Sequence, residues 1–203
     1  LRVDSVKMSK SLDNFFTVRE VLKKYDAEVV RHLLIASHYR SPINYSELSL
    51  QQSTAALERL YIGLQGVDIE TAKSLTNSRF EKAFHKAMDD DFNTAEAFGV
   101  LFDLVKELNK EKSAGSELAG QLGALLVKLG ATLGVLQQKP EEFLQASVNN
   151  DVDAEEVEGL IIARKQARAD KNWAKADEIR DKLAQLKVVV EDGADGSSWR
   201  IER

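Results

Sequence analysis

Hydrophobic positions between residues 47 and 136 recur at the spacing of amphipathic helices. Apolar side chains three and four positions apart mark the segments 47–65, 79–88, 94–108 and 118–136. Ser46 precedes the first segment and Gly66 follows it, while Asn93 and Thr94 are candidate caps for the third. This pattern predicts an antiparallel helical bundle over residues 47–146.

The preceding 46 residues show shorter periodic segments. Thr17 and Glu20 have the spacing of a capping box, which predicts a helix that ends near Tyr25. An apolar stripe predicts a second helix over residues 27–37. We expect residues 38–44, which include a proline, to form a loop.

The pattern changes after residue 146. Residues 147–154 are polar and aperiodic, so we place a linker there. Val157 and Trp173 open two further helical patterns, and a β-branched run at 188–190 followed by a turn-rich stretch predicts a hairpin. The expected fold is mainly α, with a small α+β unit of helices and a β-hairpin over residues 155–203.

Composition narrows the class of protein. Of 203 residues, 43% are hydrophobic and 30% are charged, as in a soluble globular chain of one or two compact units. Apolar runs are too short for a membrane span, and the start is neither an initiator methionine nor a secretory signal. We therefore expect a truncated piece of a cytoplasmic, monomeric protein with no membrane contact.

Metal and nonspecific nucleic-acid binding are disfavoured by the same inventory. Without cysteine, the chain offers no disulfide, thiolate zinc site or cysteine nucleophile, and its three histidines lack metal-site spacing. We expect no metal in these residues. The net charge of −5 argues against broad neutralisation of phosphates, although local patches could still recognise a nucleic acid.

The string Lys7-Met8-Ser9-Lys10-Ser11 is the strongest candidate for chemistry. Two ammonium groups on a short polar loop can follow a triphosphate as negative charge moves onto departing pyrophosphate. Taken alone, the string fits a solvated basic segment better. Its context decides between the two readings.

Three strings together resemble the cysteinyl-tRNA synthetases, a family of class I aminoacyl-tRNA synthetases. They are residues 7–11, 38–46 and 89–94, in that order, and the resemblance continues from Trp173 to Trp199. The family implies that the whole enzyme activates L-cysteine with ATP and magnesium and charges tRNA(Cys). It also implies that the nucleotide-binding sheet and a zinc-bound cysteine pocket lie outside this chain, which alone should be inactive.

The resemblance assigns roles to the loop. It implies that Lys10 contacts ATP, with Lys7 and Ser9 in support. Asp13 stands where the family pattern has glycine, which removes backbone freedom and adds a negative charge near the phosphates. Because aspartate tolerates the left-handed conformation better than most residues, we expect a local cost only.

Two clusters precede the carboxy-terminal unit. Arg31, His32, His38 and Arg40 form a basic cluster with Tyr39, and the resemblance places this region near the inner corner of the tRNA. Phosphate contact by Arg40 and simple loop packing are both open. The acidic run 89–91 could bind a hard cation, but stabilisation by the following helix dipole explains it better.

The carboxy-terminal unit carries groups that suit recognition of unpaired bases. Arginine reads guanine edges or phosphate, tryptophan stacks on bases, and aspartate accepts from exocyclic amines. Under the resemblance, the anticodon-binding candidates are Arg164, Arg168, Trp173, Asp177 and Asp192. Alternatively, Trp173 is a buried anchor and Asp177 only pairs with Arg180, whereas Trp199 should pack the hairpin onto the helices.

Two other functions remain open at this stage. The chain could be a noncatalytic module for tRNA binding or protein interaction, in which the lysine loop is a remnant. It could also belong to a ligase that joins cysteine to a small amino sugar. The long segment after Ala154 argues against the latter, because an enzyme without tRNA needs no anticodon reader.

Overall fold

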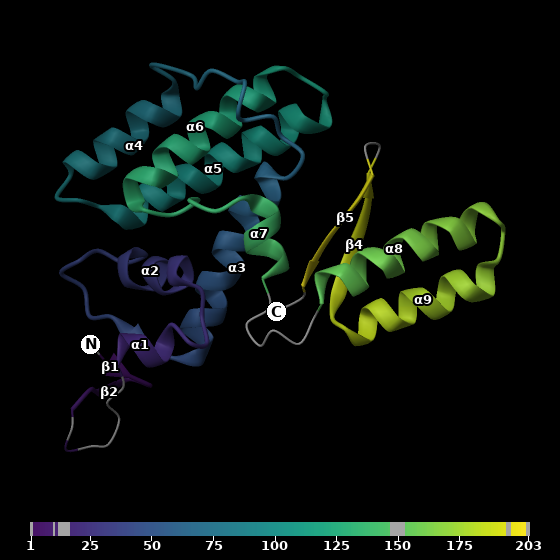
Figure 1. Ribbon diagram of the computed structural model, residues 1–203. Coiled ribbons are helices and arrows are strands. Elements are labelled where there is room, and N and C mark those ends of the chain that lie inside the picture. Colours follow the sequence, from purple (N-terminus) through teal and green to yellow (C-terminus); the bar gives the residue numbers. More distant parts are fainter. Residues whose placement is uncertain (1, 10, 12–16, 147–152, 194–195, 202–203) are drawn as a thin grey trace. The chain divides into compact units, whose positions relative to one another are not determined.

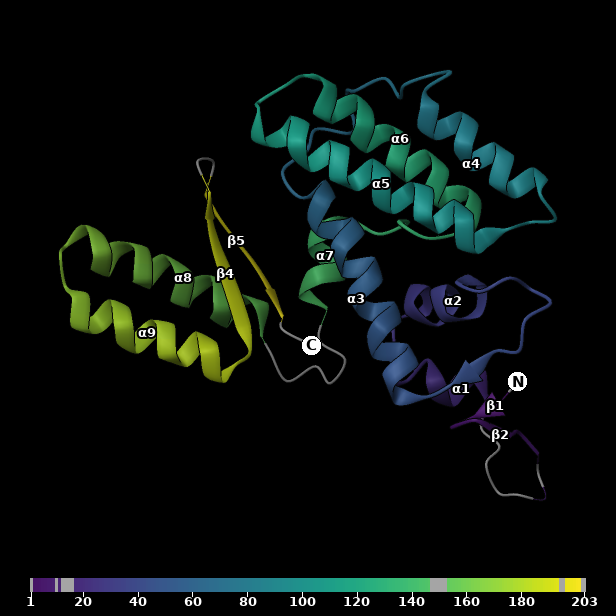
Figure 2. The same ribbon diagram turned by 180° about the vertical axis from the view of Figure 1, so that it is seen from behind.

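The computed structural model describes residues 2–9, 11, 17–146, 153–193 and 196–201 (Figures 1 and 2). The chain divides into two compact units, Leu1–Pro140 and Glu141–Arg203. Helices dominate both units, which confirms the mainly α prediction. Of the predicted linker, residues 147–152 lie outside the described part of the chain.

A small sheet opens the first unit. Strand β1 (Arg2–Val3) pairs antiparallel with β2 (Val6–Lys7) and parallel with β3 (Asn44–Tyr45). The sequence did not predict this sheet, although residues 38–43 form the expected loop and only Asn44 of the predicted range 38–44 belongs to a strand. Strands of two residues are too short to show an alternating pattern, so only the distant pairing reveals them.

Two short helices follow. Helix α1 (Val18–Val21) has the predicted capping box: the Thr17 side chain accepts from Glu20 N, and Glu20 Oε2 accepts from Thr17 N at 2.7 Å. The regular helix ends at Val21 rather than near Tyr25, although Tyr25 N still donates to Val21 O at 3.0 Å. Asp26 then caps the next helix, α2 (Ala27–Ile35).

The predicted bundle is confirmed. It comprises α3 (Glu47–Leu64), α4 (Arg79–Asp89), α5 (Thr94–Ser113) and α6 (Leu118–Leu133), and Figures 1 and 2 show α4, α5 and α6 side by side. Asn93 is the N-cap of α5, as its sequence position suggested. The fully buried side chains at its centre include Leu57, Leu60, Phe84, Leu101, Leu104, Leu125 and Leu126.

Close backbone approach shapes the bundle at one glycine. A Cβ atom at Gly63 of α3 would overlap Cγ2 of Val105 on α5. Gly99, also on α5, has open space where its Cβ would lie. Packing of α3 against α5 therefore requires glycine at the first position and not at the second.

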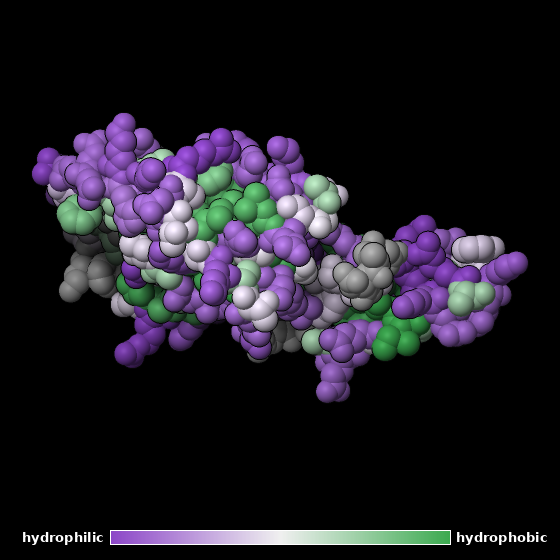
Figure 3. Space-filling view, turned by 90° about the horizontal axis from the view of Figure 1, so that it is seen from above, coloured by the Kyte–Doolittle hydropathy of each residue, from purple (hydrophilic) through white to green (hydrophobic). Residues whose placement is uncertain are grey.

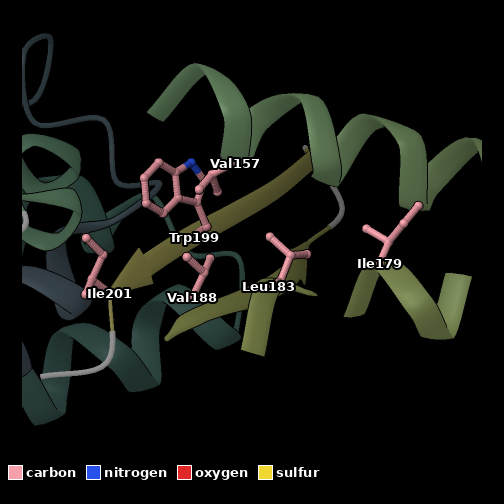
Figure 4. Packing of buried hydrophobic residues seen from close by; sticks show 6 residues of the cluster. All are labelled: Val157, Ile179, Leu183, Val188, Trp199 and Ile201. Carbon is pink, nitrogen blue, oxygen red and sulfur yellow. The ribbon is translucent and has the colours of Figure 1, made fainter. Parts of the chain in front are cut away.

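The second unit begins with the short helix α7 (Pro140–Gln145) and continues with α8 (Ala154–Ala169) and α9 (Trp173–Gln185). Strands β4 (Val188–Gly193) and β5 (Gly196–Ile201) form the predicted hairpin, with Val190 opposite Trp199. Figure 4 shows Trp199 beside Val157 of α8, and only 5% of Trp199 is exposed. The prediction that Trp199 packs the hairpin onto the helices is confirmed.

Hydrophilic residues predominate on the face shown in Figure 3, with limited hydrophobic areas between them. Within the described ranges, none of the helices combines the length and apolar character needed to cross a bilayer.

Candidate functional site

The candidate phosphate loop starts from a strained hairpin. Asp4 and Ser5 join β1 to β2 with φ values of 46° and 68°, which places two non-glycine residues in the left-handed region. Ser5 N donates to Oδ1 of Asn44 at 2.8 Å, and Arg2 N donates to Ile43 O at 2.8 Å. The strand that carries Lys7 pairs with β1, and β1 is held against the segment before α3.

Within the loop itself, Lys7 is exposed on β2 and Ser9 is half-buried. The hydroxyl oxygens of Ser9 and Ser11 lie 3.1 Å apart, so one donates to the other. Lys10 and Asp13 lie outside the described residues. The expectation that Lys10 contacts ATP therefore stays a prediction.

Arg40 lies in a cluster that joins two distant segments. Its Nη1 atom is 3.2 Å from Oδ2 of Asp91, the Tyr39 hydroxyl donates to Oδ1 of Asp91 at 2.8 Å, and Nε2 of His38 is 3.7 Å from Oδ2. The Tyr39 ring stacks on His38 at 4.8 Å and lies 5.2 Å from the Arg40 guanidinium carbon. Hydrogen bonding to Asp91 raises the pKa of the Tyr39 hydroxyl. Residues 38–40 and 89–91 were both candidate sites from the sequence, but their contact is seen only in the structure.

Arg31 and His32 do not join that surface cluster, which corrects the grouping made from sequence. His32 is 6% exposed and packs edge-on against Phe98 at 4.6 Å, and burial lowers its pKa to about 4. It is therefore uncharged at neutral pH. Arg31 donates from Nε to Leu133 O at 2.6 Å, at the end of α6.

A buried carboxylate ties α2 to the bundle, and the sequence analysis missed it. Glu28 is 6% exposed and accepts three hydrogen bonds of 2.8 Å, from the Tyr61 hydroxyl, Leu136 N and Gln137 N. Burial raises the pKa of Tyr61, so its hydroxyl remains a donor to Glu28. A lone glutamate in an apolar helical stripe was the available signal, because such a residue needs buried partners.

The anticodon candidates on the two helices gather around one turn. Arg168 closes α8 and Trp173 opens α9, with Lys171 between them at φ 57° and Asn172 N donating to Ala167 O at 2.8 Å. Arg168 is exposed and Trp173 is 61% exposed. The alternative reading of Trp173 as a buried anchor is wrong, and an exposed cation and an exposed aromatic ring lie at the two helix ends that the turn joins.

The other anticodon candidates lie at different distances from this turn. Arg164 is half-buried one helical turn before Arg168, and Asp177 lies one helical turn after Trp173, with Oδ1 3.0 Å from Nη1 of Arg180. Asp192 belongs to β4, towards the free end of the hairpin, and its side chain is outside the described part of the structure. Figures 1 and 2 show the α8–α9 turn at the end of the helical pair away from the hairpin. The anticodon role of Asp192 stays a prediction.

Comparison with known families divides the chain into three parts. Residues 1–55 match the class I (C) tRNA synthetase catalytic domain, residues 83–137 match the DALR domain, and residues 153–200 match the cysteinyl-tRNA ligase anticodon binding domain. Curated relatives match the whole chain. The cysteine–tRNA ligases of Ectopseudomonas mendocina and Azotobacter vinelandii are each 55% identical to it over 201 residues, or 99% of the chain. Over almost its whole length, the chain belongs to the cysteine–tRNA ligase family.

The chain spans 43% of the length of these cysteine–tRNA ligases, and the same share of the relative from Idiomarina loihiensis, which is 48% identical over 200 residues. The catalytic-domain match covers the β1–β3 sheet and α2, and the anticodon-domain match covers the α8–α9 turn. The Arg40–Asp91 contact thus joins a residue of the first matched region to one of the second. These correspondences identify the cysteine–tRNA ligase segments that carry each candidate residue.

Proposed function

We propose that this chain supplies the ATP-phosphate loop and the tRNA-binding surfaces of a cysteine–tRNA ligase. The whole enzyme would activate L-cysteine with ATP and magnesium and then charge tRNA(Cys). The observation that carries the tRNA role is the exposure of Trp173 and Arg168 at the two ends of the α8–α9 turn, in a segment that matches an anticodon binding domain. An exposed tryptophan next to a cation suits stacking of an unpaired base with contact to its phosphate.

The amino-terminal loop fits the phosphates of ATP. Lys7 is an exposed cation on a strand that backbone hydrogen bonds hold in place, and Ser9 and Ser11 add hydroxyl donors beside Lys10. When bound, ATP would supply the adenylyl group that is transferred to the carboxylate of cysteine, and the lysines would stabilise the charge on the departing pyrophosphate. The resident zinc ion of the family would lie elsewhere, because the chain has no cysteine to bind it.

We also propose that the isolated chain is catalytically inactive and monomeric, and that the whole protein is cytoplasmic. ATP–pyrophosphate exchange with cysteine should give no signal from these 203 residues alone. A measurable exchange rate would refute that part of the proposal.

Binding of the chain to tRNA(Cys) and to a control tRNA tests the tRNA role. Trp173→Ala should weaken binding to tRNA(Cys) about tenfold, since loss of one stacked base costs about 1–3 kcal/mol. Arg168→Ala should weaken it to a similar extent. Thermal unfolding should change little for either variant, because both side chains are exposed.

Lys165→Ala is the control, because it removes an exposed cation from the same helix, three positions before Arg168. It should weaken binding to both tRNAs slightly and equally. Equal losses for Arg168→Ala and Lys165→Ala, or equal affinity of the wild-type chain for both tRNAs, would refute anticodon reading. A noncatalytic module without tRNA selectivity would then explain the data better.

A further inference from the structure

The contacts of Asp91 form the strongest unexplained cluster on the surface of the first unit. Three consecutive side chains, His38, Tyr39 and Arg40, converge on this one carboxylate from a segment about fifty positions earlier in the sequence. The side chains of Arg40 and Asp91 are 69% and 44% exposed, and Tyr39 is 55% exposed. An ion pair this exposed contributes little to stability, because water screens it and two flexible side chains must be ordered.

Backbone strain accompanies the contact. Asp91 and Phe92 adopt φ values of 51° and 54°, so two consecutive residues with side chains lie in the left-handed region. The resulting turn directs the Asp91 carboxylate to Arg40 and leaves Phe92 66% exposed. Strain of this kind, next to a contact that stabilises little, is characteristic of functional sites.

Arg40 is arranged to receive a phosphate. Its guanidinium carbon lies over the Tyr39 ring, 5.2 Å from the ring centroid, and the contact with Asp91 involves Nη1. A guanidinium carries five N–H donors in a planar fork that matches the oxygens of a phosphodiester. The carboxylate of Asp91 therefore occupies the position that a phosphate oxygen would take.

We propose that Asp91 is an internal competitor for backbone phosphates of RNA at Arg40. In the free protein it neutralises Arg40 and, with the exposed Asp89 and Asp90 beside it, keeps this surface from attracting RNA indiscriminately. A correctly docked RNA exchanges one of its phosphates for the carboxylate. This inference rests on the proposed tRNA role, and it adds a residue that sets how tightly and how selectively RNA binds.

The test compares Asp91→Asn with Asp90→Asn in the 203-residue chain. Both changes remove one negative charge from the same turn, but only Asp91 contacts Arg40 among the described contacts. Binding to tRNA(Cys) and to a control tRNA is measured over a series of KCl concentrations. Asp91→Asn should tighten binding to both tRNAs about fivefold at low salt, and the plot of log K against log salt should steepen by about one phosphate contact.

Arg40→Ala in the Asp91→Asn background should remove the gain, because the competitor acts only through that cation. Asp90→Asn should produce a smaller gain without a steeper salt dependence. Equal effects of the two asparagine variants, weaker binding by Asp91→Asn, or no measurable binding of any variant would overturn the proposal. Loss of selectivity between the two tRNAs with the Asp91 effect retained would refute only the proposed anticodon reading.

Discussion

Replacing Glu28 by alanine should be among the most destabilising changes in the first unit. The buried carboxylate accepts from Tyr61, Leu136 and Gln137, and Tyr61 and Leu136 are themselves 0% and 3% exposed. Glu28→Ala leaves two buried donors without an acceptor, each at a cost of about 1–3 kcal/mol, and opens a small cavity. We expect the free energy of unfolding to fall by about 4 kcal/mol.

Milder changes at the same cluster should cost less. Glu28→Gln keeps one accepting oxygen but turns an NH2 group towards a donor, so we expect a loss of about 2 kcal/mol. Tyr61→Phe should cost about 1–2 kcal/mol, because it also deprives Gln138 N of its acceptor, 3.2 Å away. The double variant should lose less than the sum, since both changes remove the same hydrogen bond.

Urea unfolding followed by circular dichroism and by tryptophan fluorescence separates the two units. Both tryptophans, Trp173 and Trp199, belong to the second unit, so the fluorescence transition should stay in place while the helical signal of the first unit shifts. Glu70→Gln, the same chemical change at an exposed position, is the control and should alter stability by less than about 0.5 kcal/mol. A loss below about 1 kcal/mol for Glu28→Ala would refute the assigned role of this carboxylate.

Two further predictions concern packing and pH. Gly63→Ala should destabilise the first unit by about 1–3 kcal/mol, because its Cβ would overlap Val105. Gly99→Ala, in open space on a helix, should stabilise it by about 0.5–1 kcal/mol. Thermal unfolding of both variants measures the difference. Burial lowers the pKa of His32 from 6.5 to about 4, so the unfolded chain binds a proton more readily than the folded chain between these values. The free energy of unfolding should therefore fall by about 3 kcal/mol as the pH drops from 6.5 towards 4. His32→Gln should flatten that part of the stability curve, while His85→Gln, at an exposed position, should not; equal curves for the two variants would contradict the assignment.

Most of the helices and the carboxy-terminal hairpin could be predicted from local sequence patterns alone. Helical periodicity depends on which residues within two turns are apolar, and caps such as Thr17 and Asn93 act on backbone groups three residues away. The β-branched run at 188–190 likewise predicted the hairpin, and Trp199 predicted its packing onto the helices. These signals depend on residues close together in the sequence, so they can be recognised without knowing the tertiary contacts.

The strings that resemble the family and the candidate residues at the α8–α9 turn could also be identified without the structure. Arg168 and Trp173 are five positions apart, so any helix-turn-helix over this segment keeps them close. Asp192 lies on β4, far from them along the chain, so sequence spacing says nothing of its distance from the turn.

The contacts of the polar residues in the first unit, in contrast, could not be predicted from the sequence and are known only from the folded structure. Arg40 meets Asp91 across about fifty positions, and Glu28 meets Leu136 across more than a hundred, so no periodicity records either contact. A buried carboxylate is tolerated only when partners satisfy it, and the partners of Glu28 lie far away along the chain, where sequence spacing does not indicate them. The basic cluster expected from the sequence is therefore divided in the structure. His32 is buried and neutral, Arg31 donates to the end of α6, and Arg40 is exposed and contacts Asp91.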